Sequence, residues 1–161
     1  MGEQLKIGDV LHCKGTGILS KMIGLFTHSK ITHTALYIEV WGQPFIIDSQ
    51  KDGTNLRPLI EWTKTFQYRY IITRPCFDVN QHNLCIRALS KSGNTRYDFK
   101  SLLIRQPIRI ITGIFKTKKN EEENMVCSEF VAWCYKIPNS NKITPAELFE
   151  YCKANSFKEI N

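Results

Sequence analysis

Cys127 is the residue whose type and position best suit it to chemistry. Apolar residues surround it at helical spacing, at Val126, Phe130, Trp133, Cys134 and Ile137. Asn124 is placed to cap the first turn of this predicted helix. Free N–H groups and the positive end of the helix dipole stabilise a thiolate in a first turn. A thiolate there can attack a carbonyl carbon, although the segment alone is more typical of a small buried core cysteine.

A cysteine nucleophile needs a base, and the base needs a third group that orients it. His33 fits the role of base, because it begins the segment 33–40, whose β-branched and aromatic content predicts a strand. Asp48 lies near the end of the next apolar run, 45–49, which the turn at 41–44 makes a hairpin partner. The spacing leaves two roles open for Asp48: it either turns to solvent or holds a partner such as His33.

Other residues with suitable chemistry form weaker patterns. A zinc site built from His12, Cys13, His28 and Cys127 would lack the close ligand spacing of known zinc motifs. We therefore expect no metal and no cofactor. Glu129 points about 200° around the helix from Cys127, which indicates a structural role.

The elements that must position these residues predict an α+β fold, since a helix and a sheet come first and helices come last. The sequence predicts strands at 5–13, 33–40, 45–49 and 68–74, a turn at 51–55, an edge strand at 56–60, and helices at 18–26, 80–89, 126–137 and 145–154. Thr144, Pro145 and Glu147 give the last helix a strong start. No repeat or linker divides the chain, so we expect 1–161 to form a single domain.

The net charge of +7 is partly concentrated in the segment 100–119, where basic and apolar residues interleave. Such a stretch suits an anionic membrane surface or an acidic partner, while a core helix with a solvated basic face is the alternative. The polar run 116–124 predicts an exposed loop. The sequence contains no recognisable nucleic-acid motif, so we expect no nucleic-acid partner.

The sequence also bears on the cellular location. No apolar run approaches the roughly 18 residues of a membrane span. Residues 1–10 lack the basic start and apolar core of a signal peptide. We therefore expect a cytoplasmic protein whose six cysteines are reduced.

Four short motifs occur in a fixed order: Gly8-Asp9 before a hydrophobic strand, His33-Thr34-Ala35-Leu36, Tyr97-Asp98, and Cys127-Ser128-Glu129. Together with the closing helix that begins at Thr144-Pro145, they resemble the circularly permuted branch of the NlpC-type, papain-like cysteine hydrolases. The resemblance is close to the bacterial YiiX-like proteins and more distant to lecithin retinol acyltransferase. It implies a permuted papain-like fold in which the histidine strand precedes the cysteine helix.

The resemblance also implies roles for individual residues. Cys127 becomes the nucleophile, His33 the base and Asp48 the orienting group. Ser49 or Gln50 could instead serve as the third member, because YiiX-like proteins usually have glutamate near this place and the acyltransferase branch uses histidine. The amide of Cys127 would supply part of an oxyanion hole.

These residues favour a thiol hydrolase that cleaves an amide or ester bond through an acyl-thioester. The expected substrate is a peptide, a cell-wall amide or a lipid. If an acceptor other than water takes the acyl group, the same site is an acyltransferase. The alternatives are a lipid- or peptide-binding module on the same fold and a structural or delivery protein.

Overall fold

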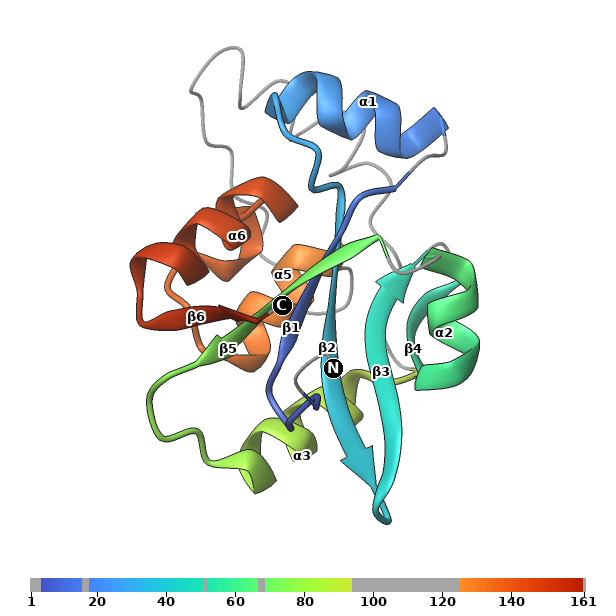
Figure 1. Cartoon of the computed structure of the whole chain (residues 1–161), viewed down its shortest axis with the longest axis vertical. Coiled ribbons are helices and arrows are strands. Elements are labelled where there is room, and N and C mark those ends of the chain that lie inside the picture. The colour runs from blue at the N-terminus through green and yellow to red at the C-terminus, as the bar shows by residue number, and fades with distance from the viewer. Residues whose placement is uncertain (1–3, 16–17, 51, 67–68, 94–124, 161) are drawn as a thin grey trace.

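The computed structural model describes residues 4–15, 18–50, 52–66, 69–93 and 125–160. Its centre is a six-stranded sheet in the order β4-β3-β2-β1-β5-β6, in which neighbouring strands are antiparallel (Figure 1). The strands are β1 (Val10–Cys13), β2 (His33–Val40), β3 (Gln43–Gln50), β4 (Gly53–Pro58), β5 (Tyr70–Pro75) and β6 (Phe157–Ile160).

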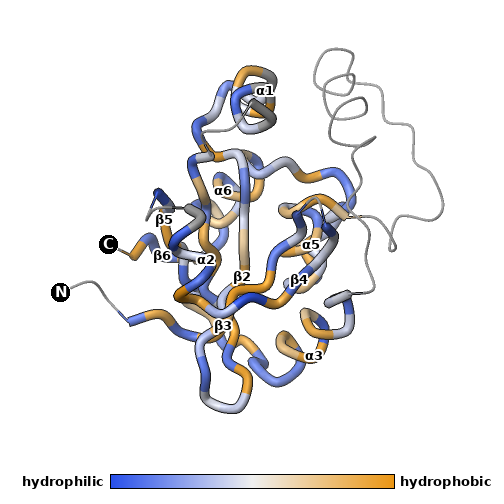
Figure 2. Tube along the Cα trace, turned by 90° about the vertical axis from the view of Figure 1, so that its right-hand side faces the viewer, coloured by the Kyte–Doolittle hydropathy of each residue, from blue (hydrophilic) through white to orange (hydrophobic). Residues whose placement is uncertain are grey.

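The helices lie on the faces of the sheet and across one of its ends. They are α1 (Ile18–Thr27), α2 (Leu59–Phe66), α3 (Gln81–Lys91), α5 (Cys127–Cys134) and α6 (Pro145–Ala154), with a 3-10 turn η2 (Ser140–Lys142). Figure 2 shows α3 and α5 together on one side of the strands. Helix α1 lies across one end of the sheet (Figure 1).

Two hydrophobic clusters hold these layers together, one on each face of the sheet. Leu36 and Ile38 of β2 pack in the cluster that contains Phe130 of α5. The intervening residues Ala35 and Tyr37 pack in the cluster that contains Trp62 of α2. Alternate residues of a strand point to opposite faces, so β2 can be apolar on both sides because helices cover both.

Several sequence predictions are confirmed. The hairpin of β2 and β3 pairs Leu36 with Ile47 and continues to Val40 with Gln43. The capping box of α6 is present: the N–H of Glu147 donates to Oγ1 of Thr144 at 3.2 Å, and the N–H of Thr144 donates to Oε2 of Glu147 at 2.7 Å. The class is therefore α+β, as expected.

Two predicted boundaries are wrong, and two elements were not predicted. The predicted turn at 51–55 ends early, because Gly53 takes a φ of 101° and the chain then pairs along β3 as far as Pro58. The strand predicted at 5–13 begins only at Val10, although Gly8 and Asp9 already form backbone hydrogen bonds with Tyr37 of β2. The sequence analysis also missed α2 and β6, which are short elements of eight and four residues.

The predictions for Tyr97, for the basic segment 100–119 and for the loop 116–124 fall outside the described residues. Within the described ranges, no helix combines the length and the apolar character needed to cross a membrane.

Candidate active site

The site forms where β2 and β3 separate. Their pairing stops at Leu36 and Ile47, so His33 and Thr34 at the start of β2 are paired only with β1. Helix α5 begins in this region and packs against both strands. Adjacent residues of an antiparallel strand direct their N–H groups to opposite neighbours. The N–H of Thr34 donates to the Cys127 sulfur.

Cys127 is the first residue of α5, and the helix start is held by three hydrogen bonds. Val126, and not the predicted Asn124, is the residue that precedes the helix. The carboxylate of Glu129 accepts the N–H of Val126 at 3.0 Å, which is the structural role expected of it. The hydroxyl of Ser49 donates to the carbonyl of Met125 at 2.7 Å, and the hydroxyl of Ser128 donates to the carbonyl of Ile143 at 2.7 Å. These contacts fix the sulfur beside β2.

His33 links the sulfur to a buried carboxylate. Its Nε2 is 2.8 Å from Oδ2 of Asp48, and its ring is also hydrogen-bonded to Cys127, for which Nδ1 is the remaining nitrogen. The side chain of His33 is 12% exposed and that of Asp48 is fully buried. The structure thus brings together the three residues that the sequence singled out.

Asp48 is surrounded by donors. Besides His33, its Oδ2 accepts from Gln50 at 2.7 Å and from the indole N–H of Trp62 at 3.0 Å. Its Oδ1 accepts from the guanidinium of Arg57. A buried carboxylate is tolerated when it is paired and hydrogen-bonded in this way.

The electrostatics of the cluster favour a thiolate–imidazolium pair. Burial raises the pKa of Cys127, but the charge of His33 and hydrogen bonds from His33 and Thr34 outweigh burial, so the pKa lies below that of an ordinary thiol. Burial lowers the pKa of His33, but the charge of Cys127 and the hydrogen bonds with Asp48 and Cys127 raise it to about 10. Because the two groups titrate together, the resulting values belong to the pair.

The carboxylate of Asp48 remains ionised in the same cluster. Burial raises its pKa, but the hydrogen bond and the charge of His33, with Gln50 and Arg57, bring the pKa below that of an ordinary aspartate.

The two alternatives for the third position have other roles. Ser49 points to the opposite face of β3 and bonds the segment before α5. Gln50 donates to Asp48, so it supports the carboxylate and does not replace it.

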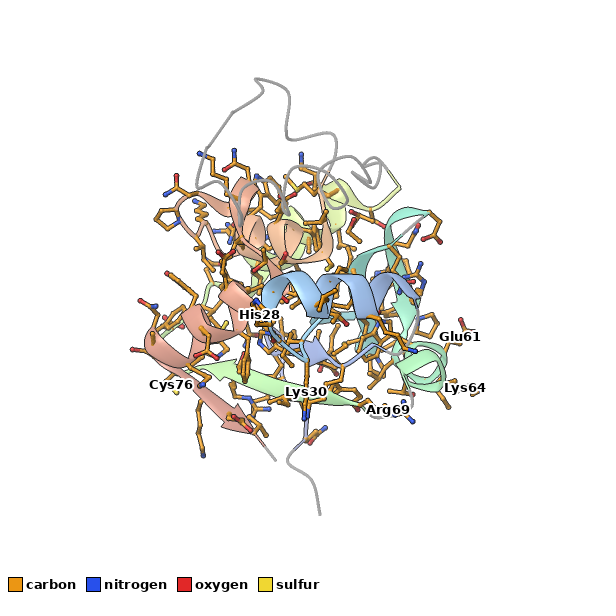
Figure 3. The ribbon with its side chains drawn as sticks, turned by 90° about the horizontal axis from the view of Figure 1, so that it is seen from above. His28, Lys30, Glu61, Lys64, Arg69 and Cys76 are labelled. Carbon is orange, nitrogen blue, oxygen red and sulfur yellow. The ribbon has the colours of Figure 1, made fainter. Side chains whose placement is uncertain are left out.

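The other histidines lie apart from this cluster. His12 is fully buried, its Nε2 lies 2.9 Å from Oγ1 of Thr73, and burial lowers its pKa to about 3. His28 lies at the end of α1 on the outside of the molecule (Figure 3). Across the described ranges, no three His, Cys, Asp or Glu side chains are grouped so that they could hold a metal ion.

Arg57, Trp62 and Thr34 are site residues that the sequence analysis missed. Arg57 and Asp48 lie on one face of the sheet, because Arg57 pairs with Ile46, two residues before Asp48. The alternation of Asn55 and Arg57 with Thr54 and Leu56 was a signal for this strand, but it depends on knowing the register. Trp62 follows from α2, which the sequence analysis did not predict.

No family model matches the sequence, and no curated protein matches it. The structure is similar to the crystal structure of metalloprotein YiiX from Escherichia coli O157:H7, described as DUF1105, with a TM-score of 0.64. The similarity covers 99% of this chain and 98% of that chain, at 19% sequence identity. The fold is YiiX-like. At this identity the likeness concerns the fold alone, so any chemistry of the YiiX-like fold in this chain must be argued from its own side chains.

Proposed function

We propose that this YiiX-like chain is a cysteine hydrolase that cleaves an amide or ester bond through an acyl-thioester on Cys127. The observation that carries the proposal is the position of His33. Its ring is hydrogen-bonded to the Cys127 sulfur and, through Nε2, to the buried carboxylate of Asp48. A nucleophile, a base and an orienting group in this arrangement are the parts that covalent catalysis of acyl transfer requires.

The first half of the reaction forms the acyl-enzyme. The Cys127 thiolate attacks the substrate carbonyl carbon, a C–S bond forms, and the carbonyl oxygen becomes an oxyanion. The N–H of Cys127 lies at the first position of α5, where helix N–H groups have no partner within the helix, so it is placed to stabilise that charge. The imidazolium of His33 gives its proton to the departing nitrogen or oxygen as the C–N or C–O bond breaks.

The second half returns the enzyme to its starting state. Neutral His33 takes a proton from water as the water oxygen attacks the thioester carbonyl. The C–S bond then breaks and the acid product leaves, which regenerates the thiolate–imidazolium pair. Asp48 holds the His33 ring in place through both halves. If an alcohol or amine acceptor replaces water in this half, the same residues perform acyl transfer.

The permuted papain-like assignment is part of the same proposal. The order of the site residues supports it, because the histidine strand β2 and the aspartate strand β3 precede the cysteine helix α5. This is the order that the resemblance to the permuted NlpC-type hydrolases implies. The substrate class follows from that resemblance only as far as an amide or ester of a peptide, a cell-wall fragment or a lipid.

The YiiX neighbour is described as a metalloprotein. Among the described residues of this chain, no three His, Cys, Asp or Glu side chains are placed to bind a metal ion together. His33 already has hydrogen bonds to both Cys127 and Asp48. We therefore derive no step of the proposed reaction through a metal.

Selective alkylation tests the proposed function. We expect iodoacetamide at pH 6 to modify Cys127 before Cys13, Cys85, Cys134 and Cys152, whose thiol pKa values are raised chiefly by burial. Peptide mass spectrometry after timed quenching measures the order. Exposed Cys76 is the reference for a thiol that the reagent can reach (Figure 3). Labelling of Cys76 before Cys127, or no labelling of Cys127, would contradict an activated thiolate.

A variant separates the enzyme from a binding module on the same fold. Incubation with a mixed lipid and peptidoglycan extract should leave an acyl mass on the wild-type protein and none on Cys127→Ala. Equal binding by both proteins, with no adduct on either, would favour the binding module.

A further inference from the structure

Arg57 connects the buried end of the site to the surface. On β4, its Nη1 donates to Oδ1 of Asp48, and its Nη2 donates to both carboxylate oxygens of Asp52 at 3.0 Å. The side chains of Asp48, Arg57 and Asp52 are 0%, 23% and 65% exposed. The guanidinium is therefore held at both ends, and the end that faces Asp48 is the more enclosed.

Arg57 supplies a charge that the other donors to Asp48 do not. Gln50 and Trp62 donate to Oδ2 through neutral groups. His33 is a cation only while Cys127 or solvent has given it a proton. An arginine guanidinium, in contrast, carries a fixed positive charge in proteins. Among the described residues, Arg57 is thus the arginine that forms an ion pair with this buried carboxylate.

The charges of the four groups balance when the site is ready to react. The thiolate of Cys127 and the carboxylate of Asp48 are negative, and the imidazolium of His33 and the guanidinium of Arg57 are positive. Without Arg57 the same protonation state would leave an uncompensated negative charge in a poorly solvated place, which is unfavourable. The arrangement therefore requires a cation at Arg57 for the thiolate and the carboxylate to be ionised together.

We propose that Arg57 is a positioning residue of this site, which turns Asp48 toward His33 and keeps the cluster neutral when Cys127 is a thiolate. This inference deepens the proposed function and rests on it. Arg57 acts through Asp48 and is not placed to touch the substrate carbonyl. Asp52 in turn limits the directions in which the guanidinium can swing.

The sign of the effect follows from electrostatics. Loss of a nearby cation raises the pKa of an acid, because the deprotonated form loses a favourable interaction. Removal of the Arg57 charge therefore shifts the protonation of the Cys127 thiolate to higher pH. A lysine at position 57 keeps the positive charge, so it should leave the pH at which the Cys127 thiolate forms close to that of the wild type.

The experiment compares Arg57→Gln, which keeps an N–H donor without the charge, with Arg57→Lys, which keeps the charge. The matched control is Arg69→Gln, the same loss of charge at an exposed residue on the outside of the molecule (Figure 3). The rate of Cys127 alkylation by iodoacetamide is measured from pH 4 to pH 9. We expect the acid limb of Arg57→Gln to move up by about one pH unit, which slows alkylation below the limb roughly tenfold. We expect Arg57→Lys and Arg69→Gln to follow the wild type.

Different failures have different signatures. A fast wild-type Cys127 with an unshifted acid limb in folded Arg57→Gln overturns the role of Arg57 and leaves the hydrolase proposal standing. A slow wild-type Cys127 overturns the hydrolase proposal itself. Circular dichroism checks folding; if Arg57→Gln does not fold, the folded Arg57→Lys protein decides, since an acid limb displaced from that of the wild type would overturn the role of the charge.

Discussion

Five cysteines among the described residues are buried or half-buried, yet the pKa values of their thiols are shifted in different directions. For Cys13, Cys85, Cys134 and Cys152 burial dominates and raises the pKa. For Cys127 the neighbouring His33 outweighs burial and lowers it. The contrast indicates that the cation and the hydrogen bonds beside Cys127, rather than its exposure, set its pKa apart from those of the other buried thiols.

The charge of the thiolate should be visible from the histidine. In Cys127→Ser the anion is absent, so burial gains weight and the pKa of His33 should fall from about 10 toward or below its ordinary value of about 6.5. Titration of the imidazole ring protons by NMR measures the change. His12 serves as an internal control, since burial lowers its pKa to about 3 and this should not depend on Cys127.

An unchanged titration of His33 in Cys127→Ser would show that the two groups do not interact. In that case, the pH dependence of turnover should also lack the rise and fall that a coupled Cys127 and His33 would produce. With the interaction present, turnover should rise with pH through the lowered pKa of Cys127 and fall as His33 loses its proton near pH 10.

Local patterns made Cys127, His33 and Asp48 candidates, and the resemblance to the permuted NlpC-type hydrolases implied their roles. Cys127 precedes a helical apolar stripe, His33 begins a strand, and Asp48 is a carboxylate after three apolar residues. Arg57 and Trp62 could not be chosen in this way. Their roles depend on the register of β4 against β3 and on the packing of α2 over that face, which are long-range properties.

At the scale of elements, local signals were most informative where side chain and backbone interact directly. The start of α6 was predictable because Thr144 and Glu147 cap it through contacts three residues apart. The start of α5 was not, because it is held from a distance by Ser49 and internally by Glu129, and no capping side chain precedes it. The edge strand predicted at 56–60 is β4, but its start at Gly53 was hidden because the polar residues Thr54 and Asn55 follow and were assigned to a turn.

The cap of α6 gives a prediction at this scale. Thr144→Val keeps the shape of the side chain and removes the acceptor for the N–H of Glu147, so it should lower the free energy of unfolding by about 1 kcal/mol. Urea denaturation followed by circular dichroism measures the change.

The matched substitution is Thr54→Val on β4. The hydroxyl of Thr54 is buried, and it has no hydrogen-bond partner within the part of the chain that the structure describes. Removal of an unpaired buried hydroxyl should leave stability unchanged or raise it. Equal losses in the two variants would mean that the cap contributes nothing specific.

At the scale of the whole molecule, contacts between residues far apart in the sequence join the segment before β1 to β5 and to the end of α5. The hydroxyl of Tyr135 donates to the carbonyl of Gly8, and Arg74 pairs with the buried Asp9 near the N-terminus. Strand β6 adds the last residues of the fold to the edge of β5. These contacts hold the two halves of the chain together. The proposed base His33 and orienting group Asp48 come from the first half, and the proposed nucleophile Cys127 comes from the second.

The net charge of +7 gives the prediction at this scale. We expect the protein to sediment with vesicles that contain phosphatidylserine at low salt, and to be released as ionic strength screens the attraction. Vesicles of phosphatidylcholine alone are the control for lipid binding without charge.

Two sets of substitutions locate the attraction. Lys116, Lys118 and Lys119 changed together to Gln should weaken sedimentation more than the same change at Lys64, Lys136 and Lys158. If both triple variants weaken it equally, overall charge and not the segment 100–119 drives the association.

The parting of β2 from β3 has a consequence for the protein after it has reacted. The N–H of Thr34 donates to the sulfur of Cys127 at the place where a neighbouring strand would otherwise have accepted it. A thioether or thioester sulfur is a poor hydrogen-bond acceptor. Acylation or alkylation of Cys127 therefore weakens the hydrogen bond that joins β2 to the start of α5. The acyl-enzyme should consequently melt at a lower temperature than the resting protein. Release of the product should restore both the thiolate and the original melting temperature.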